Sequence, residues 1–411
     1  MRISLKSTLI IFLFINFIFC QKIKTGIEVL KETNFKVLEN KNVALITNQT
    51  GVDSQFNSTI DILFNAKNFK LKLLLAPEHG IRGEISAGIK FKNTLDPKTG
   101  LQIVSLYFTN KNEIKQYLKN IDVIIYDIQD VGSRPYTYIS TMGEAMNLAA
   151  ENNIEFIVLD RPNPLGGIRI EGNIPEKNFY SFISKYPIPY IYGLTCGELA
   201  YFINSENLLG NNLKCKLKII KMKKWKRHML FKDTGLMWIP TSPHILEMDT
   251  PFYFAATGAV GELNQIFNIG VGYTFPFKVI AVQNNLLNEK FLFHNMVNIN
   301  GVKLLPIFIK PFYGNLKGNR LFGIKLYIKN FRKVDLIKIQ FQVLEILFNS
   351  GLKYSILNKI NPKQIKMFNL ALGSDKYFKW LKNGEFGKIY SFLNKDILKF
   401  RIKSQKYYLY D

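Results

Sequence analysis

The residues best suited to acid–base chemistry follow an apolar run at 71–76. The sequence Pro-Glu-His-Gly at 77–80 comes directly after that run. A carboxyl group in such a turn is partly removed from water, and desolvation favours the protonated form that a proton donor needs. We therefore expect Glu78 to be a catalytic acid, with His79 as a second catalytic group. Capping of the following turn, or an ion pair with Arg82, is the structural alternative for Glu78.

Acidic residues also follow the apolar run at 123–128. Asp127 and Asp130 lie three residues apart, and Arg134 and Tyr136 follow in the same segment. Cleavage of a glycosidic bond ordinarily needs two carboxyl groups, one that donates a proton and one that acts as nucleophile or activates water. Asp127 is a candidate for the second catalytic carboxyl group, and Asp130 for substrate binding. The alternative is that Asp127 holds Arg134 or a loop amide as a structural contact.

A third polar segment, Asp-Arg-Pro-Asn-Pro at 160–164, ends the last of these runs. Its prolines fix the backbone, so we expect the side chains of Asp160, Arg161 and Asn163 to face a ligand bound in a cleft. Asn163 suits sugar hydroxyls, and Arg161 can bind a carboxylate through its planar fork. Asn48, in the polar segment after the first apolar run, is a further candidate for substrate binding. A contact between Asp160 and Arg161 that only stiffens the loop is the alternative.

A regular alternation of strands and helices must position these polar segments. Five apolar runs rich in β-branched residues lie at 43–47, 71–76, 103–107, 123–128 and 156–160. Helix-like segments at 57–68, 112–120 and 141–152 separate several of them. This alternation predicts crossover helices on a parallel sheet, and the continuous hydrophobicity fits a sheet covered on both faces. Ligands bind at the carboxyl ends of such strands, so the polar segments should meet at one edge.

The whole chain predicts an α/β protein with two domains. Its 411 residues are 47% hydrophobic, which is enough for a large core. We expect a Rossmann-like parallel sheet domain at 21–265 and a smaller α/β carboxyl-terminal domain at 266–411 that closes the cleft. A strand at 324–330 and an amphipathic helix at 334–349 are the clearest elements of the second domain.

The first twenty residues have the pattern of a secretory signal peptide. Two basic residues precede an apolar run at 9–19, which is too short to span a bilayer as an ordinary helix. Cleavage before Gln21 is expected, and lipid attachment at Cys20 is the alternative that would bring the protein to a membrane. We therefore expect an exported protein, periplasmic or secreted. Cys196 and Cys215 can form one disulfide at most.

Several other functions are disfavoured by the sequence. The formal charge of +24 comes from lysines spread along the chain, without an arginine-rich arm, so nucleic acid is not an expected partner. The histidines lack zinc-binding spacing, and the sequence has no Walker loop, dinucleotide fingerprint or nucleophile elbow. No cofactor or metal is expected. A magnesium-dependent hydrolase that uses Asp127, Asp130 and Asp160 is the remaining alternative of this kind.

Five long segments together resemble the bacterial exo-β-N-acetylmuramidases. They are TNQTGVD at 47–53, APEHGIRGE at 76–84, YDIQDVGSRPYTY at 126–138, LDRPNPLGG at 159–167 and ATGAVGELNQIFNIGVGYTFPF at 256–277. The resemblance implies a Rossmann-like domain, a smaller carboxyl-terminal domain and an active site between them. It also implies release of N-acetylmuramic acid from the non-reducing end of peptide-free peptidoglycan sugar chains, in cell-wall turnover or recycling.

The resemblance also implies roles for individual residues. Glu78 corresponds to the favoured catalytic acid, while Asp127, Asp130 and Asp160 are candidates for its partner. The lactyl carboxylate of muramic acid requires a cation, which selects Arg134 or Arg161, and our hypothesis is that Arg134 grips it while Tyr136 and Asn163 position the ring. A non-catalytic protein that binds cell-wall glycans is the alternative, although a binder would not need an acid in a strand-end turn. Glu171 and Glu262 are expected to be loop or cap residues.

Overall fold

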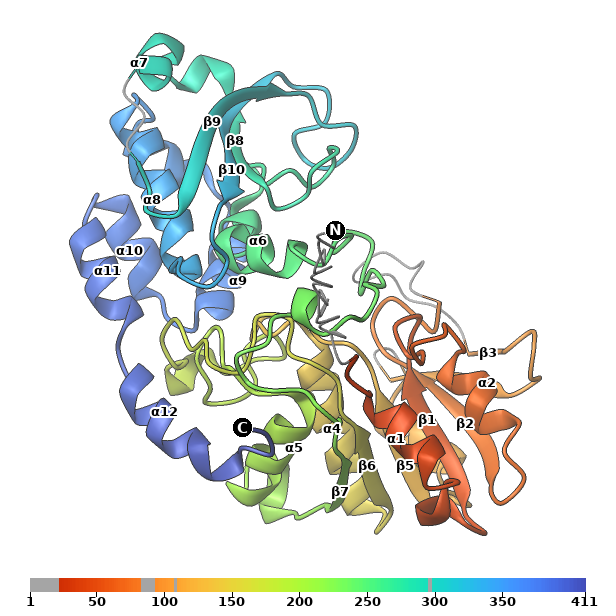
Figure 1. Ribbon diagram of the computed structural model, residues 1–411. Helices are drawn as coiled ribbons and strands as arrows, with labels where there is room; N and C mark the ends of the chain where they lie inside the picture. Colours follow the sequence, from red (N-terminus) through yellow and green to blue (C-terminus); the bar gives the residue numbers. More distant parts are fainter. Residues whose placement is uncertain (1–21, 83–92, 107–108, 295–297) are drawn as a thin grey trace, which may run out of the picture.

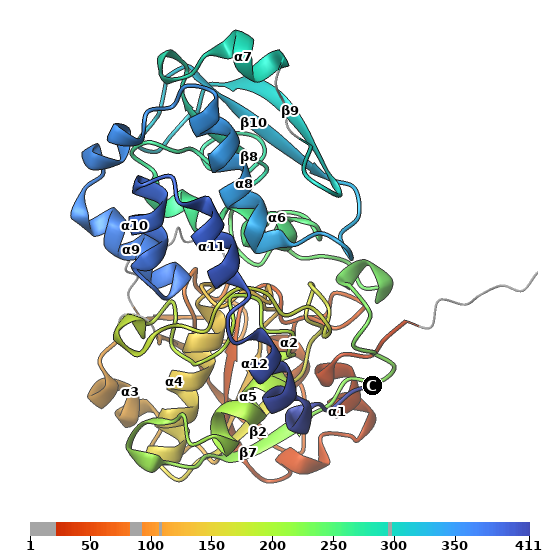
Figure 2. The same cartoon turned by 90° about the vertical axis from the view of Figure 1, so that its left-hand side faces the viewer.

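The computed structural model of the chain describes residues 22–82, 93–106, 109–294 and 298–411. The predicted signal peptide and Cys20 lie outside these residues. Two bodies are visible in Figures 1 and 2, an amino-terminal one built on a large sheet and a smaller carboxyl-terminal one above it. No helix of the described part is both long and apolar enough to cross a membrane.

The amino-terminal domain is built on a seven-stranded sheet in the order β3-β4-β2-β1-β5-β6-β7. All neighbouring strands are parallel except β3, which pairs antiparallel with β4 at the edge. The strands are β1 (Asn42–Thr47), β2 (Lys70–Ala76), β3 (Thr94–Leu95), β4 (Gln102–Ser105), β5 (Val123–Asp127), β6 (Glu155–Leu159) and β7 (Lys216–Ile220). The six parallel strands follow the Rossmann order, which confirms the predicted fold class.

Alternate residues of the central strands enter two separate cores, because successive side chains of a strand point to opposite faces. In β1, Val43 and Leu45 belong to one core, and Ala44 and Ile46 belong to the other. Helices α1 (Gly26–Glu32) and α2 (Thr59–Phe64) cover the first face. The opposite face is covered by α3 (Lys111–Tyr117), α4 (Tyr138–Glu151) and α5 (Cys196–Ser205). The sheet is therefore buried on both sides, as its continuous hydrophobicity predicts.

The carboxyl-terminal domain contains a three-stranded antiparallel sheet in the order β8-β10-β9. Its strands are β8 (Val279–Gln283), β9 (Val302–Ile309) and β10 (Leu321–Ile328), and its helices are α7 (Glu289–His294), α8 (Leu336–Asn349), α9 (Pro362–Leu372), α10 (Lys376–Lys382) and α11 (Phe386–Leu393). The predicted strand at 324–330 and helix at 334–349 correspond to β10 and α8. Helix α6 (Thr250–Thr257), which precedes the predicted boundary at residue 265, packs against α8.

The end of the chain returns to the amino-terminal domain. Helix α12 (Ile397–Ser404) runs down beside α5 in Figure 2, and the Phe400 ring lies 5.8 Å from that of Phe202. Tyr410 then donates a hydrogen bond of 2.6 Å to Asp160. Residues 397–411, predicted as part of the second domain, therefore pack on the first. Cys196 and Cys215 are both buried as free thiols.

Candidate active site

Four polar segments meet at the carboxyl edge of the large sheet, as predicted. They follow β1, β2, β5 and β6. Strand β2 pairs with one edge of β1 and β5 pairs with the other edge, so the strand order reverses at β1. This reversal beside β1 is the point at which open α/β sheets bind ligands. The segments differ, however, in how many of their polar side chains remain available to a ligand.

Glu78 occupies a tight turn directly after β2. The Gly80 amide donates to the Pro77 carbonyl oxygen at 3.1 Å, which closes the turn. The Glu78 side chain is buried, with 8% exposure, and Thr137 Oγ1 donates a hydrogen bond of 2.6 Å to its Oε2. A carboxyl group with so little contact with bulk water, and with a hydroxyl donor on Oε2, has the setting of a catalytic acid.

His79 follows in a conformation that most side chains avoid. Its φ is +73°, at a turn position where glycine is usual. Such backbone strain is found at functional sites more often than elsewhere. His244, from the segment before α6, lies close enough that burial, followed by the charge of His79, lowers the pKa of His244. The turn thus brings an imidazole and a carboxyl group to the same place.

Hydrogen bonds of two tyrosine hydroxyls join the segment after β1 to the segment after β5. Asn48 Nδ2 donates to Tyr138 at 2.9 Å, and Tyr138 donates in turn to the Thr241 carbonyl oxygen at 2.5 Å. The Tyr136 and Thr241 hydroxyls are 2.8 Å apart. Burial raises the pKa of both tyrosines, so their hydroxyls stay neutral. Asn48 therefore positions Tyr138, rather than binding substrate as predicted.

Tyr136 also connects the two domains through aromatic contacts. Its ring lies 4.9 Å from that of Tyr138 and 5.7 Å from that of Phe254 in α6, both edge to face. Phe254 makes the same kind of contact with Phe277, at 5.2 Å. Such pairs add to the stability that burial alone provides. The turn with Glu78 and the entry to α4 are therefore tied to the carboxyl-terminal domain.

Protein groups occupy both oxygens of Asp127. Arg161 Nε donates to Oδ1 at 2.5 Å, and Arg161 Nη2 donates to Oδ2 at 2.9 Å. Thr59 donates to Oδ2 at 2.5 Å, and the Asp127 side chain has no exposure. These are the contacts of a structural ion pair, and the catalytic role of Asp127 stays a prediction.

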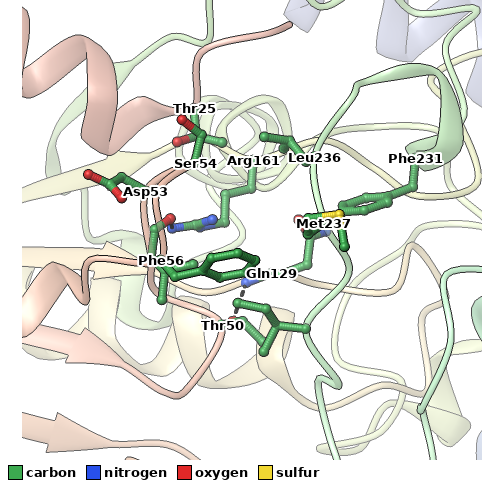
Figure 3. Close-up of a pocket in the computed structure, with 12 residues that line it drawn as sticks. Thr25, Thr50, Asp53, Ser54, Phe56, Gln129, Arg161, Phe231, Leu236 and Met237 are labelled. Atoms are coloured by element: carbon green, nitrogen blue, oxygen red, sulfur yellow. Dashed lines mark hydrogen bonds between the residues drawn. The ribbon is translucent and has the colours of Figure 1, made fainter.

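Arg161 also lacks the space to bind an acidic sugar. Its guanidinium lines a cavity of about 30 Å³, which holds a water molecule or two. In Figure 3 the Arg161 side chain reaches into this cavity between Asp53 on one side and Phe231, Leu236 and Met237 on the other. The predicted carboxylate-reading role of Arg161 is inconsistent with a cavity of this size.

Asp160 is a structural residue at the start of α5. Its Oδ1 accepts from the amides of Gly197 at 2.8 Å and Arg161 at 3.0 Å. Its Oδ2 accepts from the hydroxyls of Thr195 at 2.7 Å and Tyr410 at 2.6 Å. Burial raises its pKa to about 6. Four protein donors occupy the carboxylate, which are the contacts of a structural residue, and the substrate role of Asp160 stays a prediction.

Asp130 and Asn163 hold neighbouring loops together. Asp130 Oδ2 accepts from Gly132 N at 2.7 Å and from Tyr192 at 2.5 Å, and burial raises the pKa of Asp130 to about 6. Asn163 Oδ1 accepts from Leu165 N at 2.9 Å. A side chain at Gly132, whose φ is +81°, would come within 2.2 Å of that oxygen. Asp130 Oδ1 is buried without a partner, and the predicted contacts of both residues with sugar stay predictions.

Arg134 is fully buried and makes four hydrogen bonds within the protein. Its Nη1 donates to the carbonyl oxygens of Asn173 at 2.8 Å and Ile188 at 2.9 Å, and its Nε donates to the Ser184 hydroxyl at 3.0 Å. Its Nη2 donates to the Ala371 carbonyl oxygen in α9 at 3.1 Å. Arg134 therefore connects the two domains, and its binding of a lactyl carboxylate stays a prediction.

Glu262 has properties that its sequence context did not suggest. It lies in the short helical segment Val260–Leu263 after α6, and burial raises its pKa to about 7. Within the described residues its side chain makes no hydrogen bond or ion pair. Its charge acts on buried Tyr190, whose hydroxyl is likewise unpartnered there. The sequence signal that could have identified Glu262 is an acidic residue within a run of glycine and small apolar residues.

Segment 134–137 contacts Glu78 at one end and Tyr190 at the other. Thr137 bonds Glu78, and Arg134 donates its amide to the Tyr190 carbonyl oxygen at 2.7 Å. The charge of Glu262 acts on the hydroxyl of the same tyrosine. Among the described residues no group of three acidic, histidine or cysteine side chains could hold a metal ion. Glu262, and Asp130 through its Oδ1, have oxygens without a described hydrogen-bond donor, and Glu78 lies in the turn after β2.

Comparisons with known proteins match both domains of the chain to one family. A family model described as exo-β-N-acetylmuramidase NamZ, N-terminal, matches residues 43–249, and its C-terminal counterpart matches residues 252–410. The chain is 39% identical over 329 residues to the peptidoglycan β-N-acetylmuramidase NamZ of Bacillus subtilis, covering 79% of this chain and 77% of the relative.

Two solved structures share the whole architecture. A crystal structure of a DUF1343 family protein from Bacteroides fragilis has 45% sequence identity and a TM-score of 0.85, and a second one from the same organism has 26% identity and a TM-score of 0.69. Each alignment covers 95% of this chain and 99% of the solved chain. With family models that together span nearly all of the described residues, the chain belongs to the exo-β-N-acetylmuramidase NamZ family.

Proposed function

We propose that this protein is a glycoside hydrolase that releases N-acetylmuramic acid from the non-reducing end of peptide-free peptidoglycan sugar chains. Family membership supports the muramidase class and the peptidoglycan substrate. The observation that carries the proposal is the buried Glu78 carboxyl group, held by Thr137 in the turn after β2. The reaction belongs to the turnover or recycling of cell-wall fragments, outside the cytoplasm.

Glu78 acts as the proton donor to the glycosidic oxygen in this proposal. Its side chain is buried at the carboxyl edge of the sheet, where substrate binds in such folds. As the bond breaks, the proton of Glu78 passes to the departing sugar and the positive charge that develops on the muramic acid ring must be balanced by a second carboxylate.

Glu262 is the second carboxyl group in this proposal. It is the mostly buried acid of the α6 region whose oxygens no described protein donor occupies. The aspartates Asp127 and Asp160 are less suited to the role because their oxygens accept from protein donors. The same contacts disfavour a magnesium-dependent hydrolase, since the three aspartates do not share a ligand position.

The decisive experiment compares wild-type protein with Glu78→Gln on aryl β-glycosides of N-acetylmuramic acid and N-acetylglucosamine. Wild-type protein should release the aryl group from the muramic substrate with at least a hundredfold preference. On a disaccharide of N-acetylmuramic acid with N-acetylglucosamine, whose sugar leaving group needs a proton, Glu78→Gln should lose about 10³-fold in kcat, in the range of losing general acid catalysis. Glu39→Gln, an exposed glutamate, is the matched control and should keep full activity. Wild-type protein without muramidase activity would refute the proposal.

The mode of attack needs its own measurement. Peptide-free glycan chains whose reducing ends have been reduced with borohydride should still release muramic acid, because the reaction begins at the other end. Products should appear as single sugars from the earliest time points. Internal cleavage into long oligosaccharides would show an endo-acting enzyme instead.

A further inference from the structure

An aromatic loop of the carboxyl-terminal domain lies next to the proposed catalytic turn. This loop, residues 310–320, joins β9 to β10 and projects on the side away from α8, α10 and α11 (Figure 1). Tyr313 in the loop shares a hydrogen bond of 2.7 Å with His244 Nε2. His244 in turn lies within electrostatic range of His79, the neighbour of Glu78. Tyr313 is therefore connected to the catalytic turn through one intervening side chain.

The exposed rings of this loop contrast with the buried groups beneath them. Tyr313 is 50% exposed and Phe312 is 62% exposed, whereas Glu78 and Tyr136 are 8% and 9% exposed. Large exposed aromatic side chains next to a ligand site commonly serve as contact surfaces for the ligand. The buried groups are placed to surround the one sugar that enters the site. The exposed rings are placed to contact a sugar that stays outside the site.

The loop is held rigidly enough to present these rings. Phe312 donates its amide to the Gly272 carbonyl oxygen at 2.7 Å, and its ring stacks on Tyr273 at 5.3 Å. Gly272 has a φ of +88°, and a side chain there would meet the Tyr313 carbonyl oxygen at 2.5 Å. A surface fixed before binding loses little conformational freedom when the ligand arrives.

We infer that Tyr313, supported by Phe312 and oriented by His244, forms the subsite for the leaving-group sugar, an N-acetylhexosamine of the remaining chain. The inference rests on the proposed function. The apolar face of this sugar packs on the Tyr313 ring, while the muramic acid ring lies below, beside Glu78. Tyr313 is thus a specificity-determining residue that favours a sugar aglycone over a small one.

The test uses two muramic acid substrates that differ only in the leaving group, a disaccharide with N-acetylglucosamine and the methyl β-glycoside. Tyr313→Ala should lower the ratio of kcat/KM for the disaccharide over the methyl glycoside about tenfold, mainly through KM, as expected for the loss of one stacked ring. Tyr313→Phe keeps the ring and should retain most of that ratio. Tyr327→Ala, which removes a tyrosine of β10 with 42% exposure, is the matched control and should leave the ratio unchanged.

The outcomes separate the subsite from the function on which it rests. If wild-type protein releases no muramic acid from either substrate, the proposed function is overturned. If wild-type protein is active and Tyr313→Ala loses equal activity on both substrates, or loses none, the subsite alone is overturned. A ratio that falls as far in Tyr313→Phe as in Tyr313→Ala would also overturn it, because the hydrogen bond to His244, not the ring, would then carry the effect.

Discussion

Thr137 Oγ1 donates a 2.6 Å hydrogen bond to Glu78 Oε2, and this contact links the segments that follow β5 and β2. These two strands flank β1 on opposite sides, so the hydrogen bond spans the reversal point of the sheet. A donor to a carboxyl oxygen stabilises the ionised form and so sets the pH at which the acid gives up its proton. The contact therefore bears directly on the proposed chemistry.

Replacing Thr137 by Val should shift the pH profile of the enzyme. Without the hydroxyl donor, Glu78 keeps its proton to higher pH, so the alkaline limb of the kcat profile should move upward while kcat at the optimum falls about tenfold. The measurement is kcat from pH 4 to 9 on the aryl muramic substrate. Thr141→Val, one turn further along α4, removes a hydroxyl that bonds only its own helix and should leave the limb in place. Movement of the acidic limb alone would assign Glu78 to the base or nucleophile instead.

Replacing His79 by Gly should maintain or raise the stability of the protein and lower its activity. Positive φ costs a non-glycine residue roughly 1 kcal/mol, so His79→Gly should unfold at equal or higher urea concentration than wild type. Activity should fall, because the imidazole beside Glu78 is lost. His79→Ala is the control, since it loses the same imidazole but keeps the strain. Equal activity of His79→Gly and wild type would show that His79 has no role in the reaction.

Replacing Arg134 by Met should affect folding and leave substrate choice alone. The guanidinium satisfies three buried carbonyl oxygens and a hydroxyl, and removing such a group typically costs about 3–5 kcal/mol. Equilibrium unfolding in urea measures this cost. The ratio of rates on muramic and glucosamine glycosides, measured on the folded fraction, should equal that of wild type. A selective loss of the muramic substrate would restore Arg134 as the carboxylate receptor.

A double-mutant cycle on Asp127 and Arg161 should identify a structural ion pair. Each single replacement, Asp127→Asn or Arg161→Met, leaves one buried group without its partner and should cost about 3–5 kcal/mol of unfolding free energy. The double variant should cost less than the sum, because neither charge remains. Additive losses would mean that the two residues act independently.

Replacing Glu262 by Gln should change how stability depends on pH. Burial raises the pKa of Glu262 to about 7 in the folded protein, against 4.5 for an ordinary solvated glutamate. Between these values the folded state binds more protons than the unfolded state, so stability falls as pH rises, by at most about 3 kcal/mol for this group. Glu262→Gln should lack that slope and be more stable than wild type at pH 8, although it loses activity. Identical slopes from pH 4.5 to 8 would show that Glu262 is ordinarily solvated.

The sequence alone was sufficient to predict the parallel strands of the large sheet and the position of Glu78 at its carboxyl edge. Strands β1, β2, β5 and β6 were predictable because their apolar runs are continuous and separated by helix-like segments. The order of the chain along a parallel sheet then determines that the residues after each strand reach the same edge. A Glu directly after β2 must therefore lie at that edge.

Only the tertiary structure decided which polar side chains remain available there. Asp160 receives a hydrogen bond from Tyr410 at the other end of the chain, and Arg134 reaches Ala371 in α9. Glu262 lies in the segment 256–277 that shares the family resemblance, but its burial is set by the fold. Tyr313 lies outside all five segments and reaches His244 only through the fold. Residue type and spacing reveal local structure, whereas the availability of a buried acid or cation depends on partners that long-range packing brings to it.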